Sequence, residues 1–179
     1  VDETRLTLGG ECRLGVLMFC AIVGVAPLRE MTEPPELVRL LNIYLGAMVE
    51  KIRQTDGTVD KFGGDAILCV WGAPAADPAD ANHALLAAFE MQNAMVLYNK
   101  QLAEIGVDTV GMGIGLHAGD FIAGNIGSED RMEYTVIGNH VNIAQRIEAT
   151  ASSGMIMASQ DVCQRLDGRL LGTRYRNVS

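Results

Sequence analysis

Two patterns of hydrophobic positions alternate along the chain, one typical of buried strands and the other of amphipathic helices. Residues 14–23 form an unbroken apolar run that ends at Gly24, which predicts a central strand buried on both faces. Residues 34–54 repeat their apolar positions at steps of three and four, which predicts a helix with one buried face. We expect Thr32 to cap this helix and Pro34-Pro35 to lie in its first turn.

The next segment predicts a β-hairpin. Apolar residues at 58–59 and 66–71 flank Gly63-Gly64, which we interpret as a tight turn. The turn places Lys61 and Asp65 near one loop, where a carboxylate can reach a metal ion and a lysine can reach a nucleotide. The alternative is that Asp65 only forms the turn and Lys61 ends a solvated strand. These residues alone leave both interpretations open.

The second half of the chain predicts helices and short strands. We expect a helix over 79–104, with Met91 and Met95 in the core. Two strands should follow, over 109–117 and 121–126, joined at Ala118-Gly119-Asp120. The sequence then predicts a strand at 134–137, a helix that begins at Gly138-Asn139, a strand at 155–157 and a final helix.

A glycine-rich stretch in this half resembles a nucleotide-binding motif. Residues 113–118 fit the dinucleotide pattern G-x-G-x-x-A, but that motif must open a helix, and here a turn and a strand are expected. Gly111, Gly113 and Gly115 instead predict one bare strand face for close packing. His117 then becomes a core or strand-end histidine.

The order of the predicted elements indicates an α+β fold. It begins with a ferredoxin-like βαββαβ core and continues with extra C-terminal strands and helices. Such a sheet carries helices on one face and leaves the other for a ligand or a partner subunit. We expect residues 1–12 to be a linker from a missing upstream region, because the chain begins at Val1, and residues 13–179 to be one domain.

Composition excludes some classes of protein. The chain has 179 residues, 49% of them apolar, with a net charge of −8 and a pI near 4.8. This acidic balance argues against a nucleic-acid partner, and no apolar run reaches the roughly 18–20 residues that span a bilayer. The four cysteines contain no C-x-x-C pair, which favours buried free thiols in a reducing compartment.

Two polar residues are spaced to project from one face of the predicted third helix. Asn142 and Arg146 lie four positions apart, and an amide with a guanidinium suits a phosphate or a ribose. The alternative is a solvated helix face on which Arg146 pairs with a nearby glutamate. Taken alone, the spacing favours this alternative.

Three motifs together resemble the catalytic domain of class III nucleotide cyclases of the bacterial adenylate cyclase type. They are Thr58-Val-Asp-Lys-Phe-Gly-Gly-Asp65, the segment from Gly124 to Gly138, and Val141-Asn-Ile-Ala-Gln-Arg146. The resemblance covers about residues 8 to 165. It implies the class III cyclase fold and the formation of 3′,5′-cyclic AMP and pyrophosphate from ATP. The sites would lie at the interface of a head-to-tail dimer, formed with a second copy or with a different cyclase domain.

The resemblance also implies roles for individual residues. Asp65 matches one of two aspartates that hold two Mg²⁺ or Mn²⁺ ions, which activate the ribose 3′-hydroxyl and neutralise the phosphates. Lys61 and Thr135 match the pair that reads the adenine edge, whereas guanylate cyclases usually carry Glu and Cys there. Asn142 matches the residue that positions the ribose, and Arg146 matches the arginine that stabilises charge on the α-phosphate.

The segment from Phe19 to Val25 departs from the family pattern F-x-D-I-x-G-F. Ala21 stands at the position of the first metal aspartate, and a methyl group cannot bind magnesium. Phe19, Ile22 and Gly24 match substrate-binding positions, and the backbone of Ile22 matches a further metal ligand. Gly24 and its neighbours could still cradle phosphates at the start of a following helix.

Two functional hypotheses follow. The first is an adenylate cyclase domain that is weak or inactive as a homodimer, because Ala21 replaces a metal ligand. The second is a catalytically degenerate domain that serves as a heterodimer partner or regulatory module. A GGDEF-type diguanylate cyclase is rejected, because Ala66-Ile67 follows Gly63-Gly64-Asp65 where Glu-Phe would be needed. The lead-in Leu8-Gly9-Gly10-Glu11 resembles cyclases that follow sensory and transmembrane regions, so we expect a cytoplasmic domain of a membrane-anchored sensor.

Overall fold

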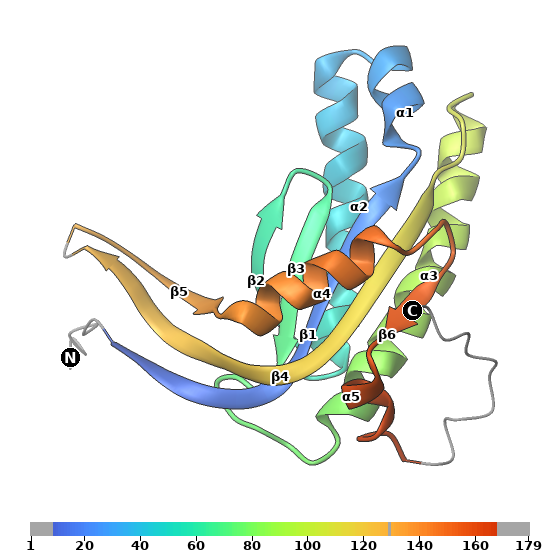
Figure 1. Cartoon of the computed structure of the whole chain (residues 1–179). Coiled ribbons are helices and arrows are strands. Elements are labelled where there is room, and N and C mark those ends of the chain that lie inside the picture. The colour runs from blue at the N-terminus through green and yellow to red at the C-terminus, as the bar shows by residue number, and fades with distance from the viewer. Residues whose placement is uncertain (1–8, 129, 168–179) are drawn as a thin grey trace.

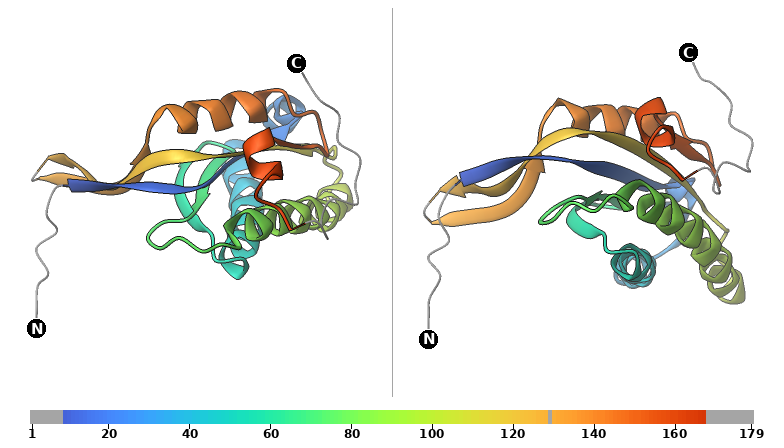
Figure 2. Two further views of the ribbon diagram at one scale, coloured as in Figure 1. Left: turned by 60° about the horizontal axis from the view of Figure 1, so that its bottom comes forward. Right: turned by 90° about the horizontal axis from the view of Figure 1, so that it is seen from below.

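The structure is a computed structural model that describes residues 9–128 and 130–167. One mixed sheet forms its centre, with helices on both faces (Figures 1 and 2). The strands are β1 (Gly9–Val23), β2 (Thr58–Gly63), β3 (Ala66–Trp71), β4 (Gly111–Ser128), β5 (Arg131–Ile137) and β6 (Ile156–Ala158). The helices are α1 (Val25–Met31), α2 (Pro34–Gln54), α3 (Asp80–Glu104), α4 (Asn139–Ala149) and α5 (Gln160–Cys163).

The sheet order confirms the ferredoxin-like core. The strands follow one another as β2-β3-β1-β4-β5, with β6 parallel to β4 and the other pairs antiparallel. The predicted central strand, β1, lies between β3 and β4 and alternates its side chains between two buried layers. Met18 and Cys20 are fully buried on one face, and Leu17 is fully buried on the other.

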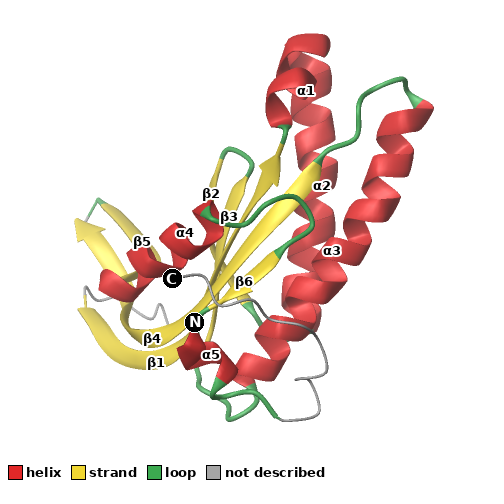
Figure 3. Ribbon diagram, turned by 45° about the vertical axis from the view of Figure 1, so that its right-hand side comes forward, coloured by secondary structure: helices red, strands yellow, loops and turns green. Residues whose placement is uncertain are grey.

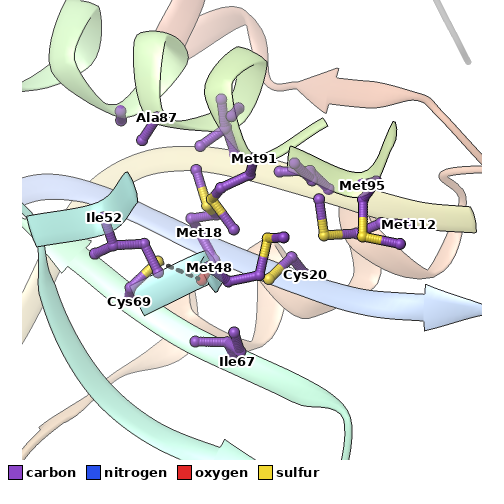
Figure 4. Close-up of a cluster of buried hydrophobic side chains, with 14 of the residues drawn as sticks. Met18, Cys20, Met48, Ile52, Ile67, Cys69, Ala87, Met91, Met95 and Met112 are labelled. Carbon is purple, nitrogen blue, oxygen red and sulfur yellow. Dashed lines mark hydrogen bonds between the residues drawn. The ribbon is translucent and has the colours of Figure 1, made fainter. Parts of the chain in front are cut away.

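The larger core lies between the sheet and helices α2 and α3, which run side by side on one face (Figure 3). Much of it is methionine and cysteine, including Met91 and Met95 as the sequence predicted (Figure 4). Burial raises the pKa of the Cys20 thiol to about 12, so this thiol stays protonated and unreactive. Cys12 is exposed, in contrast to the expectation of buried thiols.

The predicted turn at Ala118-Gly119-Asp120 is wrong, because β4 is one continuous strand. Its pairing with β1 runs unbroken from Val23↔Gly111 to Gly9↔Asn125, and Gly119 lies opposite Gly15. A side chain at Gly15 would meet the Trp71 carbonyl oxygen 2.1 Å away, so glycine here permits close packing. Both strands bend strongly and continue as a long arm along which β5 pairs (Figure 1).

The start of the chain also differs from the prediction. Residues 9–12, expected in a linker, already belong to β1, and residues 1–8 lie outside the described part. A short helix that the sequence analysis missed, α1, follows Gly24. Thr32 ends α1 and donates its hydroxyl to the Leu28 carbonyl, so it does not cap α2, which begins after Glu33.

The second sheet face is not left open as expected, because α4 covers part of it (Figure 2). Added Cβ atoms at Gly111, Gly113 and Gly115 would meet Ser153, Ala151 and Glu148 at 1.8, 2.7 and 2.3 Å. This confirms that the alternating glycines keep one face of the strand bare. None of the helices in residues 9–128 and 130–167 is long and apolar enough to cross a membrane.

Candidate functional site

The hairpin between β2 and β3 carries Asp65 to the end of β1. Gly63 pairs with Ala66, so the two-residue turn is Gly64-Asp65 and not Gly63-Gly64 as predicted. Gly64 has a φ of 67°, a left-handed conformation that glycine adopts without strain. The carboxylate of Asp65 accepts one hydrogen bond from the Ile22 backbone N–H at 3.0 Å and one from Arg29 Nη2 at 3.2 Å. The residues described therefore already occupy both oxygens of Asp65.

Ala21 lies near the C-terminal end of β1, opposite Gly113 of β4. It is on the side of the sheet that α4 covers. Two carboxylates belong to this region: Asp65 contacts the neighbouring Ile22, and Glu148 lies over Gly115 of β4. Burial raises the pKa of the Glu148 carboxyl, and the negative charge of Asp65 adds to the increase. Sequence reasoning missed Glu148, since only the packing of α4 on Gly115 brings it to the strand.

These donors do not fit a pair of divalent cations. A two-metal site requires carboxylates shared between the ions, and Ala21 supplies none. Asp65 is held by an amide and a guanidinium, and the described residues contain no cluster of three or more His, Cys, Asp or Glu side chains that could hold a metal ion. The side chains of this region therefore do not fit a pair of metal ions held by this chain alone.

Lys61 and Thr135, predicted as a pair, meet at a third residue that sequence reasoning missed. Thr135 Oγ1 donates to Asp60 Oδ2 at 3.0 Å, and Lys61 Nζ lies 3.5 Å from the same oxygen. Lys61 contacts Asp60 and not Asp65, so the two ends of the hairpin carry separate charge pairs. In the sequence, only the position of Asp60 directly before Lys61 in the motif could have indicated that it contacts this pair.

Asn142 and Arg146 project from α4 into solvent. Both side chains are exposed, and α4 begins at Asn139 after Gly138, whose φ of 148° turns the chain out of β5. The alternative in which Arg146 pairs with a glutamate is not observed among the described residues, where it makes no ion pair. The helix thus presents an amide and a guanidinium that the rest of the described chain leaves unused.

The three remaining predicted residues lie along β1 and just after it. Phe19 packs half-buried against the smaller core that contains Leu17 and Ala144, directly opposite Gly115. The Ile22 backbone N–H is already used by Asp65. Gly24, with a φ of 82°, precedes α1, and no atom lies within 4 Å of where its Cβ would be.

Two histidines, His117 of β4 and His140 of α4, contact each other at the start of α4. The sequence did not predict this contact. His117 is buried, as expected of a core histidine, and its Nε2 lies 2.8 Å from His140 Nδ1 while its Nδ1 lies 2.9 Å from Ser159 Oγ. Burial and the neighbouring His140 lower the pKa of His117. The contact ties β4 to both α4 and the start of α5.

Comparison with curated proteins finds relatives of both known and unknown activity. An adenylate cyclase of Anabaena cylindrica is 38% identical over 136 residues, which cover 74% of this chain and 26% of that protein. An uncharacterised protein of Mycobacterium tuberculosis is 38% identical over 160 residues, which cover 88% of this chain and 28% of that protein. The chain thus spans less than a third of the length of these relatives.

Solved structures agree with the sequence comparison. The guanylyl cyclase Cya2 superposes with a TM-score of 0.86 and 37% identity, covering 90% of this chain and 82% of that one. The adenylyl cyclase CyaB from P. aeruginosa gives 0.85 and 30%, covering 88% and 82%. Residues 14–178 match the family model described as the adenylate and guanylate cyclase catalytic domain. The chain therefore belongs to the class III nucleotidyl cyclase family, as its motifs and its sheet order indicated.

Proposed function

We propose that this domain takes part in converting ATP to 3′,5′-cyclic AMP as the nucleotide-holding half of a head-to-tail dimer. One observation carries the proposal. Lys61 and Thr135 converge within 3.5 Å of one Asp60 oxygen, while Asn142 and Arg146 are exposed on α4 and make no side-chain hydrogen bond or ion pair within residues 9–128 and 130–167. This supports a chain whose proposed nucleotide-binding residues are all present, whereas its proposed metal ligands are incomplete.

Each residue of this half has a distinct task in the proposed reaction. Lys61 and Thr135 bind the base, and Asn142 orients the ribose. The 3′-hydroxyl gives up its proton to a solvent water molecule, and its oxygen forms a bond to the α-phosphorus. The bond from that phosphorus to the bridging oxygen breaks, and pyrophosphate leaves with that oxygen. Arg146 donates charge-assisted hydrogen bonds to the α-phosphate oxygens, where negative charge develops in the transition state.

The metal half of the reaction is assigned to a partner subunit. Mg²⁺ or Mn²⁺ ions, when bound in this family, activate the nucleophile and neutralise the phosphates. For that task the described residues of this region offer the Asp65 carboxylate and the Ile22 carbonyl oxygen, while Ala21 has no ligating side-chain atom. The Asp65 carboxylate already accepts hydrogen bonds from the Ile22 N–H and from Arg29. A homodimer would therefore be weak or inactive, and a partner domain with both carboxylates would complete an active site.

The degenerate-partner version of this function is favoured by the ion pair of Arg29 and Asp65. The Arg29 guanidinium lies 3.2 Å from the Asp65 carboxylate. Its positive charge balances the negative charge of Asp65, a task that a bound metal ion would otherwise perform. The domain would then act mainly by providing its nucleotide half, or by regulating the partner on which it docks.

We extend the proposal to cellular context. The matched residues make up 28% of the mycobacterial relative, so a cyclase domain over 13–179 would be one part of a protein of that length. We propose that it follows a linker and a sensory region. ATP as substrate and four free cysteines both suit a cytoplasmic location.

A complementation experiment tests the proposal. One chain carries Ala21→Asp together with Arg146→Ala, which restores the metal half and removes the nucleotide half. The second chain is the wild type, which has only the nucleotide half. We expect each alone to form little cyclic AMP and the mixture to form far more, because a head-to-tail heterodimer contains one complete site. A mixture no more active than the sum of its parts contradicts the proposal.

The control for this experiment is the same mixture with Arg39→Ala in the second chain. Arg39 pairs with Glu36 on the surface of α2 and lies outside the proposed site. This variant should complement as well as the wild type, whereas Arg146→Ala in the second chain should not complement at all.

A further inference from the structure

Asp60 is a buried carboxylate that joins the two predicted base-reading residues. Its side chain is only 3% exposed. One oxygen accepts the Val136 backbone N–H at 3.0 Å, and the other accepts the Thr135 hydroxyl at 3.0 Å and lies 3.5 Å from Lys61 Nζ. These three polar contacts are all with Lys61 or with the strand that carries Thr135.

A β-bulge turns Asp60 toward this position. In the pairing of β2 with β3, Val59 faces Cys69 and Lys61 faces Leu68, so Asp60 is the extra residue without a partner on β3. Strands β2 and β5 are the opposite edges of the sheet order, and the curvature of the sheet brings them near each other (Figure 1). Asp60 bridges the two edges.

The hydrogen bond to Asp60 fixes the orientation of the Thr135 hydroxyl proton. A carboxylate can only accept, so the hydroxyl donates to Asp60 and leaves its lone pairs for another partner. Thr135 is 6% exposed, so little water competes for this hydrogen bond. Lys61 has donors only. The pair therefore offers a ligand one donor and one acceptor.

This arrangement matches adenine and opposes guanine. Adenine presents an acceptor at N1 and a donor at its N6 amino group, which complement Lys61 and the remaining acceptor capacity of the Thr135 hydroxyl. Guanine presents a donor at N1 and an acceptor at O6, the reverse order. A site built around fixed hydrogen bonds rejects a ligand that leaves its polar groups unpaired.

We propose that Asp60 is a specificity-determining positioning residue, which selects adenine by holding the Thr135 hydroxyl as an acceptor and Lys61 beside it. The inference rests on the proposed function, because it assumes that Lys61 and Thr135 bind the base. It adds that their selectivity depends on a carboxylate that touches no substrate.

Asp60→Asn separates this role from a purely structural one. The amide keeps the size of the side chain and can still accept the Val136 N–H through its oxygen. Its NH₂ group then donates to Thr135, which frees the hydroxyl proton to point at the base. Asp56→Asn is the matched control, because Asp56 lies four positions before Asp60 in the sequence, its side chain is 86% exposed, and the change in charge is the same.

The measurement is the dissociation constant of ATP and of GTP for each chain, by calorimetry at one fixed Mn²⁺ concentration. We expect the wild type and Asp56→Asn to prefer ATP. Asp60→Asn should reduce the ratio of ATP to GTP affinity by about tenfold, the effect of one reversed hydrogen bond. In a Thr135→Val background, Asp60→Asn should change the ratio much less, because the hydroxyl is gone.

Two results overturn the inference in different ways. If the wild type prefers ATP and Asp60→Asn keeps the same ratio, or weakens both nucleotides equally with a lower melting temperature, Asp60 is only structural. If the wild type shows no preference for ATP, then the assignment of Lys61 and Thr135 in the proposed function fails as well.

Discussion

At the scale of single residues, the proposed function makes Asp65 half of an incomplete metal site. In that proposal Ala21 stands where a second carboxylate is needed, and Arg29 places a guanidinium 3.2 Å from Asp65. The Arg29 side chain is 53% exposed, and exposed ion pairs of this kind contribute only about 0–1 kcal/mol. Arg29 therefore competes weakly with a metal ion, while the methyl group of Ala21 is the main defect.

Removing this competition should have a small and measurable effect. In an Ala21→Asp background, Arg29→Ala should tighten Mn²⁺ binding by up to about fivefold, because Asp65 loses its intrachain cation. Titration of Mn²⁺ followed by calorimetry measures the change. Arg39→Ala, which removes a similar exposed arginine paired with Glu36, should leave the affinity as it was. Equal effects of the two substitutions would contradict the role of Arg29.

His117 should make stability depend on pH. Its pKa is lowered from 6.5 in the fold, chiefly by burial, so the unfolded chain binds a proton at a higher pH than the native one does. Stability should therefore fall as pH drops below about 6.5 and level off below the native pKa. Urea unfolding across this range should show a smaller decrease for His117→Gln than for the wild type. An identical decrease would show that His117 is not the group responsible.

At the scale of elements, α4 is the part of the site most dependent on packing. It rests on the bare face of β4, and a Cβ at Gly115 would lie 2.3 Å from the Glu148 backbone nitrogen. The helix carries Asn142 and Arg146, so the distance between α4 and the sheet determines the positions of both side chains. The histidine contact between His117 and His140 fixes its first turn.

Gly115→Ala should therefore disturb both stability and the site. We expect a loss of about 1–3 kcal/mol in the free energy of unfolding, because α4 backbone must move away from the sheet. Gly46→Ala is the control, since Gly46 lies exposed in α2 with no atom within 4 Å of its Cβ position. That change should stabilise by about 0.5–1 kcal/mol. Urea denaturation measures both, and equal effects would contradict the packing described here.

The elements also show what a sequence can and cannot predict. Residues 34–54 and 79–104 were predicted as helices because their apolar spacing is regular over many turns. The turn at Ala118-Gly119-Asp120 was wrong, because glycine marks both turns and close strand packing, and only the pairing with β1 distinguishes them. Asp60 was missed for a similar reason. Its role arises from a bulge and from the meeting of two sheet edges, neither of which leaves a local pattern.

At the scale of the whole molecule, the proposed function divides one chain into two unequal halves of a catalytic site. In this proposal the nucleotide half, formed by β2, β5 and α4, keeps its side chains. The proposed metal half, at the end of β1 and the tip of the hairpin, lacks a ligand. Symmetric pairing of such chains would repeat the same defect at both sites, whereas pairing with a complete cyclase domain would give one intact site.

Cyclic AMP formation by this chain and by its Ala21→Asp variant tests the central claim most directly. Both are assayed with ATP and Mn²⁺ at equal concentration, beside Ala21→Asn, which has a similar size without the charge. Restoring a missing transition-state stabiliser should raise the rate by at least about 10²-fold for Ala21→Asp, and Ala21→Asn should gain little. If the wild type forms cyclic AMP as fast as Ala21→Asp does, then residue 21 is not at a metal position, and the division of this chain into one intact and one defective half is wrong.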